Sequence, residues 1–132
     1  DIPVLAAECS DGSHWNAAEF IRRHACDIMR TSTHSKGGFT GGMKVGHVAE
    51  AFGMKAEVHG GGHNNLHLCL ALPNNTYYED LVIDVEDIEA KGKGQLKFEN
   101  GMYSFKEQVA GVGIEYDHDE LETISIQKYE KF

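Results

Sequence analysis

The first 83 residues alternate between short apolar segments and segments with helical periodicity. Strands are expected at residues 3–8, 25–32, 55–59 and 76–82, with a helix in each interval between them. The strands follow one another at intervals of about 20 to 30 residues, which is long enough for a helical crossover. Connections of this length predict parallel strands with right-handed crossovers. Four such strands leave two open edges, so the pattern predicts half of an eight-stranded α/β barrel.

Local signals place the ends of the helices. Asn16 and Thr40 are predicted to cap the first two helices, since both side chains can accept a hydrogen bond from a free backbone N–H. Phe20 and Ile21 are expected to face the core. Gly53 is predicted to end the second helix.

Composition excludes several classes of function. The chain has 132 residues, a length that predicts at most one compact unit. Its net charge of −9 argues against a nucleic-acid partner, because acidic chains repel phosphates. No apolar run approaches the ~18 residues of a membrane span, so we expect neither a signal peptide nor a membrane partner.

Charge and residue usage change near residue 83. Residues 1–83 hold seven of the eight histidines and ten of the fifteen glycines, whereas residues 84–132 carry a net charge of −6. We therefore divide the chain into 1–83 and 84–132. The three cysteines, Cys9, Cys26 and Cys69, are odd in number and form no CxxC pair. Reduced thiols and a cytoplasmic location are expected.

Polar residues stand at the carboxyl ends of all four expected strands: Glu8, Ser32, His59 and Glu79. In an α/β barrel the active site is built at this rim, since the loops there converge on the mouth. For Glu8 two interpretations stay open. It is either a metal ligand or a carboxylate paired with a base such as Arg30.

His59 precedes three glycines, Gly60–Gly62, which allow the backbone to approach a ligand closely. This suits a general acid or base, although a structural histidine at a turn remains the alternative. Arg30 lies on the same strand face as Ser32, and an inward-facing arginine needs an anionic partner. His34 and Lys36 follow in a polar loop that either binds an anionic ligand or is simply solvated.

Three stretches resemble a known family: TGGMKVGHVAEAFGMKAEVHGGG, LPNNTYYEDL and GVGIEYD. They are similar to the C-terminal part of the mandelate racemase/muconate lactonizing enzyme group of the enolase superfamily. The resemblance implies that residues 1–83 are strands five to eight of a modified TIM (β/α) barrel. It implies that 84–132 is a C-terminal segment packing on the barrel and on an α+β capping domain. The rest of the same polypeptide would supply the missing half barrel and capping domain, and a homo-oligomer is expected.

The resemblance also implies a chemistry. In this family Mg²⁺ binds the substrate carboxylate, a base removes the adjacent proton, and the metal stabilises the enolate. By position, Glu8 resembles a metal-binding carboxylate, His59 the catalytic acid or base, and Glu79 a residue that binds the substrate carboxylate. Ser32 stands where racemases and many dehydratases carry Asp and lactonizing enzymes carry Lys. We expect Ser32 to help orient His59.

The favoured function is Mg²⁺-dependent dehydration of a sugar acid, an aldonate or aldarate. Arg30, His34, Lys36 and Asn74 offer polar groups for substrate hydroxyls or a second carboxylate. Without Asp at position 32, His59 is expected to donate a proton to the departing hydroxide. The family's first two metal ligands and the base of strand two have no counterpart in these 132 residues. The alternatives are a racemase or epimerase of the same superfamily, and a non-catalytic fragment or interaction module.

Overall fold

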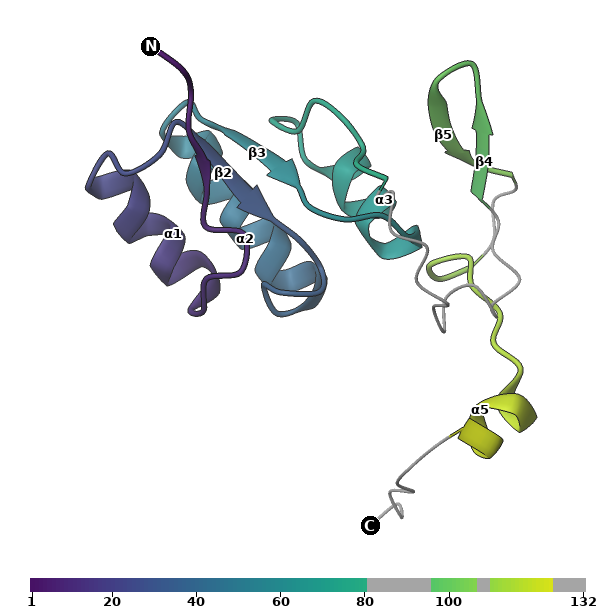
Figure 1. The fold of residues 1–132 in the computed structure, drawn as a ribbon. Helices are drawn as coiled ribbons and strands as arrows, with labels where there is room; N and C mark the ends of the chain where they lie inside the picture. The colour runs from purple at the N-terminus through teal and green to yellow at the C-terminus, as the bar shows by residue number, and fades with distance from the viewer. Residues whose placement is uncertain (81–95, 107–109, 125–132) are drawn as a thin grey trace. The chain divides into compact units, whose positions relative to one another are not determined.

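The computed structural model describes residues 1–80, 96–106 and 110–124 (Figure 1). The chain forms two compact units, 1–83 and 84–132, so the expectation of at most one unit is wrong. Within the described residues, no helix is long and apolar enough to cross a membrane.

The first unit is built on a parallel sheet with the strand order β1-β2-β3. The middle strand pairs with both neighbours, and its Arg30 stands opposite Glu57 of β3. One helix follows each strand, as the alternating pattern predicts (Figure 1). The elements are β1 (Leu5–Ala6), α1 (Ser13–Arg22), β2 (Ile28–Thr31), α2 (Gly38–Ala51), β3 (Lys55–Val58) and α3 (His63–Ala71).

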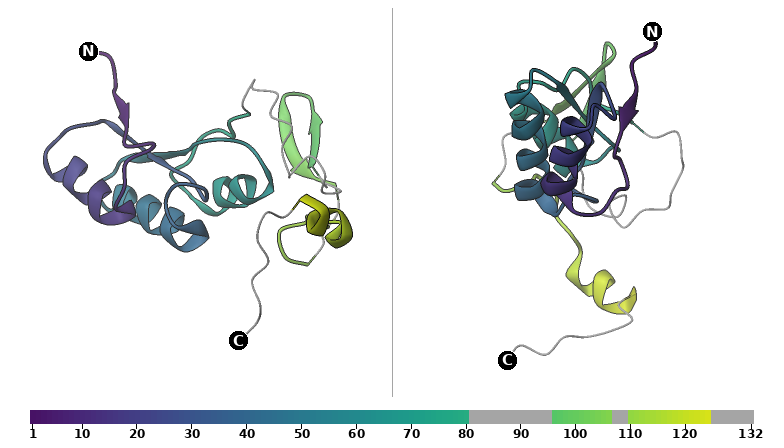
Figure 2. Two further views of the ribbon diagram at one scale, coloured as in Figure 1. Left: turned by 60° about the horizontal axis from the view of Figure 1, so that its bottom comes forward. Right: turned by 90° about the vertical axis from the view of Figure 1, so that its left-hand side faces the viewer.

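The helices lie along one face of this sheet, and the core is between the two layers (Figure 2). Ile21 of α1 and Val45 of α2 pack there with Met29 and Ala56 of the strands. Ile21 is buried and Phe20 packs against the same cluster, which confirms that both face the core. Because strand residues alternate in direction, Arg30 points to the face away from the helices. This face carries the polar residues.

Glycines, not polar side chains, begin the first two helices. The N-caps are Gly12 and Gly37, with φ of 81° and 84°, and no side chain caps either helix. The predicted capping roles of Asn16 and Thr40 are therefore wrong. Both loops enter the helix through left-handed backbone, which glycine adopts without strain. The predicted end of α2 is confirmed, since Gly53 follows its last residues with φ 68°.

The predicted fourth strand is not formed over 76–80; residues 81 and 82 lie outside the described residues. Where a fourth strand would pair with β3, side-chain oxygens accept the hydrogen bonds of backbone N–H groups. The Val58 N–H donates to Asn75 Oδ1 at 3.0 Å, and the Thr76 N–H donates to Glu57 Oε2 at 3.0 Å. The segment therefore runs beside β3 without the repeated backbone bonds that define a strand.

The second unit contains an antiparallel hairpin and a short helix. The hairpin joins β4 (Leu96–Glu99) to β5 (Met102–Phe105), and α5 spans His118–Ile124. Asn100 and Gly101 form the turn with φ of 53° and 77°, the left-handed pair that a two-residue hairpin turn needs. Phe98 and Tyr103 stand opposite each other with ring centroids 4.9 Å apart. Within the acidic segment 84–132, residues 84–95, 107–109 and 125–132 lie outside the described residues.

Candidate active site at the carboxyl ends of the strands

Four charged or titratable side chains meet at the carboxyl ends of the sheet: Glu8, Arg30, His59 and Glu79. Glu8 follows β1, Arg30 belongs to β2, and His59 comes directly after β3. Glu79 reaches them from the segment that follows α3. The parallel register brings the strand ends to one edge, so residues from four separate parts of the chain become neighbours.

His59 lies between two carboxylates. Its Nδ1 is 2.8 Å from Glu79 Oε2, and its Nε2 is 3.1 Å from Glu8 Oε1. The Gly60 N–H also donates to Glu79 Oε2, at 2.6 Å. A carboxylate on Nδ1 holds the imidazole in one orientation and leaves Nε2 as the nitrogen that faces Glu8.

The guanidinium of Arg30 contacts the carboxylates of both Glu8 and Glu79, and Arg30 is only 4% exposed. Its Nη2 donates to Glu79 Oε1 at 2.6 Å, and its Nε donates to Glu8 Oε2 at 3.4 Å. Nη1 donates to the hydroxyl of Tyr77 at 3.2 Å. Burial acts to lower the pKa of Arg30, but the hydrogen bond and charge of Glu79 outweigh it and raise this pKa. Arg30 thus has the carboxylate partners expected of an inward-facing arginine.

Glu79 is held as a carboxylate. Burial acts to raise its pKa, but the hydrogen bonds from Gly60, Arg30 and His59 have the larger combined effect. The pKa of Glu79 is therefore lowered from its ordinary value of 4.5. Both oxygens of Glu79 are engaged by this chain, Oε1 by Arg30 and Oε2 by His59 and Gly60. The substrate-binding role expected of Glu79 stays a prediction.

Glu8 retains the chemistry of a metal ligand. Its side chain is 39% exposed, and its contacts with Arg30 at 3.4 Å and with His59 Nε2 at 3.1 Å are longer than those of Glu79. Exposed carboxylate oxygens are what Mg²⁺ prefers, so Glu8 fits as one ligand. Within the described residues, no group of three or more His, Cys, Asp or Glu side chains is arranged to hold a metal ion. These residues therefore offer one oxygen ligand and not a complete site.

Ser32 is buried in the turn after β2 and does not reach His59. Its Oγ accepts hydrogen bonds from the N–H of His34 at 2.9 Å and of Ser35 at 3.4 Å. No hydrogen bond joins Ser32 to His59 in the part of the chain that the structure describes. The expectation that Ser32 orients His59 is corrected: the serine closes a turn, as short hydroxyl side chains often do, and Glu79 contacts the imidazole.

Lys36 has a structural role in place of the expected substrate contact. Its ammonium is buried and donates to Ala7 O at 2.6 Å and to Ser10 O and Ser10 Oγ at 2.7 and 3.3 Å. Burial is the main reason that its pKa is lowered. An ammonium has three hydrogens, so these acceptors account for all of them. Lys36 thereby holds the loop that carries Glu8.

The other two expected substrate contacts differ in position. His34 is exposed beside the site, with its Nδ1 3.3 Å from Asn65 Nδ2. Asn74 lies at the other end of β3, where its amide donates to Gly46 O and Met54 O. Asn74 therefore belongs to the fold and not to the site.

Sequence reasoning missed Tyr77 and Asn65. Tyr77 was not among the expected site residues, yet its hydroxyl accepts a hydrogen bond from Arg30. Asn65 is fully buried and contacts the loops after β2 and β3. A signal existed, because this asparagine follows the glycine triplet at the start of α3.

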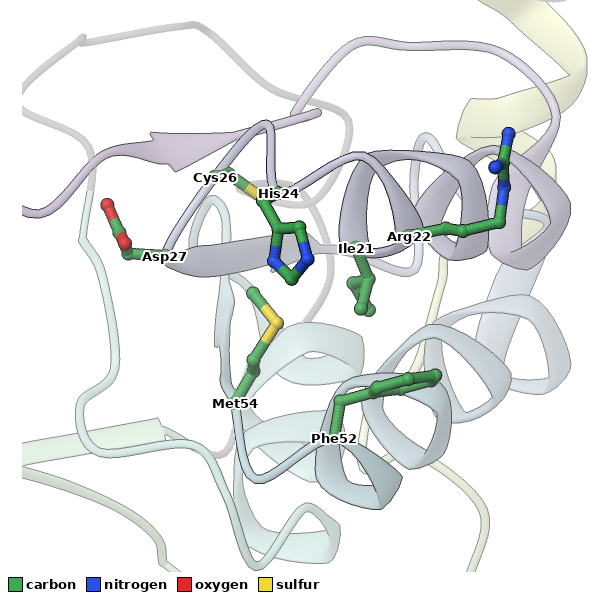
Figure 3. A pocket seen from close by; sticks show the side chains of 7 residues that line it. All are labelled: Ile21, Arg22, His24, Cys26, Asp27, Phe52 and Met54. Carbon is green, nitrogen blue, oxygen red and sulfur yellow. The ribbon is translucent and has the colours of Figure 1, made fainter.

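A cavity of about 460 Å³ lies at the opposite end of the sheet (Figure 3). It opens where β2 and β3 begin, between the ends of α1 and α2. The strand beginnings of an α/β barrel serve stability and not catalysis. This cavity is therefore separate from the site. Its walls are Ile21, Arg22, His24, Cys26, Asp27, Phe52 and Met54.

Comparisons with known proteins agree with this fold. The sequence profile of the family described as Enolase C-terminal domain-like matches residues 1–120. D-glucarate dehydratase from Agrobacterium tumefaciens, solved with magnesium, is 32% identical with a TM-score of 0.79. That match covers 93% of this chain and 33% of the other. A comparison with curated protein sequences gives no match.

Two further structures share the fold at lower identity. L-talarate dehydratase from Polaromonas sp. JS666, complexed with Mg and L-glucarate, is 21% identical with a TM-score of 0.70, over 89% of this chain and 30% of that one. Dipeptide epimerase from Cytophaga hutchinsonii, also complexed with Mg, is 21% identical with a TM-score of 0.73. That match covers 93% of this chain and 34% of the epimerase chain.

The chain thus spans about a third of the length of each of these three structures. The likeness confirms the expected C-terminal half of a modified (β/α) barrel and the resemblance to the mandelate racemase/muconate lactonizing enzyme group. By the profile match over residues 1–120, the chain belongs to the Enolase C-terminal domain-like family.

Proposed function

We propose that this chain supplies half of the active site of a Mg²⁺-dependent enzyme that dehydrates a sugar acid. The observation that carries the proposal is the imidazole of His59 between the carboxylates of Glu79 and Glu8. One carboxylate orients the ring, and the other is exposed enough to bind a metal. Proton transfer next to a metal-bound carboxylate needs both groups side by side.

Each side chain of the site has its own role in the proposed reaction. Glu79 and Arg30 both contact Nδ1, and in the proposed reaction Nε2 exchanges a proton with the substrate. Arg30 keeps both carboxylates in place and balances part of their charge. Glu8 holds Mg²⁺ together with ligands from outside this chain. The metal, when bound, neutralises the charge that develops on the substrate carboxylate as the adjacent carbon loses its proton.

A sugar acid is the substrate class that the comparisons favour. D-glucarate dehydratase is the match with the highest identity among those reported above, at 32%. The structures at 21% identity support the fold alone. A polyhydroxylated acid also suits a rim that offers the exposed Tyr77 and His34.

A racemase or epimerase is the second candidate, and the Glu79 contact is what favours it. His59 was expected to act as an acid because Ser32 gives it no carboxylate partner. Since Glu79 provides one at 2.8 Å, His59 is also equipped to remove a carbon-bound proton. The two candidates differ in whether hydroxide leaves after the proton is removed.

The test uses the complete enzyme that contains this chain, with Mg²⁺ and D-glucarate. We expect loss of water from the substrate, and Glu8→Gln should weaken Mg²⁺ binding at least about tenfold in a calorimetric titration. Glu50→Gln, which changes an exposed carboxylate on α2, is the matched control and should leave the titration unchanged. No turnover of D-glucarate by the wild type would refute the assigned substrate, and an unchanged titration in Glu8→Gln would remove Glu8 from the metal site.

A further inference from the structure

Asn65 lies at the point where the two loops beneath the site come together. It is fully buried at the start of α3. Its Oδ1 accepts hydrogen bonds from both the N–H and the hydroxyl of Thr33, each at 2.9 Å. One side of the amide is therefore committed to the loop that follows β2.

The other side of the amide is committed to the loop that follows β3. Nδ2 is 2.8, 3.1 and 3.3 Å from the carbonyl oxygens of His59, Gly60 and Gly61. Three successive carbonyls can face one amide only if the backbone curls tightly. Gly60 and Gly62 adopt φ of 82° and 91° in doing so. The glycine triplet therefore wraps around Asn65, where the sequence suggested room for a ligand.

The loop held in this way positions both members of the acid–base pair. The N–H of Gly60 donates to Glu79 Oε2 at 2.6 Å, and the same oxygen is 2.8 Å from His59 Nδ1. The carbonyl of His59 is itself bound by Asn65. A closed path of hydrogen bonds thus connects Asn65 to the loop, to Glu79 and back to the imidazole.

We propose that Asn65 is a positioning residue for His59 and Glu79. It touches neither carboxylate and acts through the loop it holds. Its role rests on the proposed function only in that His59 is taken to transfer the proton. Displacing a reacting group by about 1 Å can cost on the order of 100-fold in rate. A residue that holds the loop without touching either carboxylate can therefore matter for catalysis.

Asn65→Asp is the isosteric test, because it keeps Oδ1 but turns the donor that faces three carbonyls into an acceptor. Asn65→Ala removes both the acceptor and the donor of the amide without adding charge. It replaces the aspartate variant in the test if that variant fails to fold. Asn74→Asp and Asn74→Ala are the matched controls, since Asn74 also donates to backbone carbonyls but at the far end of β3. All four are made in the complete enzyme.

Two measurements are needed. Amide hydrogen exchange should quicken at least about tenfold at residues 33–34 and 60–62 in the Asn65 variants, with little change elsewhere. In the Asn74 variants these segments should exchange as in the wild type. With D-glucarate and Mg²⁺, the Asn65 variants should lose on the order of 100-fold in kcat while Mg²⁺ affinity stays constant.

Unchanged amide exchange at both segments would overturn the role of Asn65. So would a loss of protection that is spread evenly over the whole domain. So would wild-type kcat in a variant with faster local exchange. Absence of D-glucarate turnover in the wild type would instead count against the proposed function, and the exchange measurement would still decide the role of Asn65.

Discussion

His59 Nδ1 lies 2.8 Å from Glu79 Oε2, although the two residues are separated by twenty positions in the chain. The same carboxylate oxygen accepts the N–H of Gly60 at 2.6 Å. In the proposed function, Glu79 supplies the carboxylate partner of His59 that Ser32 does not provide. The imidazole has a carboxylate partner after all, and this widens the chemistry open to His59 from donating a proton to removing one.

Stability in acid should depend on Glu79. Its pKa is lowered below 4.5, so the carboxylate stabilises the fold above pH 4.5, and this contribution is lost as the pH falls further. In Glu79→Gln the free energy of unfolding should fall less steeply below pH 4.5. Urea unfolding at a series of pH values from about 6 to 3 measures this. Parallel curves for the two proteins would show that Glu79 is not held as described.

Removing the ammonium of Lys36 should loosen the loop that carries Glu8. Lys36→Met leaves Ala7 O and Ser10 O without this donor, which should cost about 1–3 kcal/mol in the free energy of unfolding. Lys44→Met, at an exposed position on α2, is the control and should cost much less. Equal stability of the two variants in urea would contradict the role assigned to Lys36.

Gly41→Ala should destabilise the domain, against the usual trend. Alanine normally improves a helix interior over glycine by roughly 0.5–1 kcal/mol. At Gly41, however, a Cβ would lie only 1.5 Å from the carbonyl oxygen of Lys36. Overpacking against backbone should cost about 1–3 kcal/mol or more. A gain in stability in urea unfolding would show that α2 is not packed on this loop.

The cysteines should react in a defined order. Cys9 is exposed, whereas Cys26 and Cys69 are buried. Burial raises the pKa of Cys69 to about 11, and burial also raises the pKa of Cys26. Because the thiolate is the reactive form, a thiol reagent at pH 8 should label Cys9 first. Peptide mapping by mass spectrometry identifies the site, and rapid labelling of Cys69 in the folded protein would refute the prediction.

Much of the first unit was predictable, because strand and helix periodicity are local signals. The three observed strands lie inside the expected segments, and Glu8 and His59 lie at strand ends as expected. Helix starts were mistaken because Gly12 and Gly37 use left-handed backbone, which leaves no polar cap to recognise. The absence of a strand over 76–80 has a similar cause, since the side-chain oxygens of Asn75 and Glu57 accept the backbone N–H groups there and no periodicity reveals this.

Which side chains contact one another in the site was harder to predict than which residues belong to it. Ser32 and Glu79 were both expected near His59, but only the fold decides which of them reaches the imidazole. Lys36 was interpreted as a ligand-binding cation because its neighbours are polar and small. Its buried position on the carbonyls of Ala7 and Ser10 depends on a turn 26 to 29 residues earlier. Contacts of that range leave no pattern in a single sequence.

The most direct test of the account is the His59→Asn variant of the complete enzyme, assayed with Mg²⁺ and D-glucarate in D₂O. His47→Asn, an exposed histidine on α2, is the control. General acid–base groups contribute about 10²- to 10⁴-fold, so turnover should fall by that factor while Mg²⁺ affinity is kept. Retained exchange of the proton beside the carboxylate would assign His59 as the acid, and loss of exchange would assign it as the base. Wild-type turnover in His59→Asn would contradict the account.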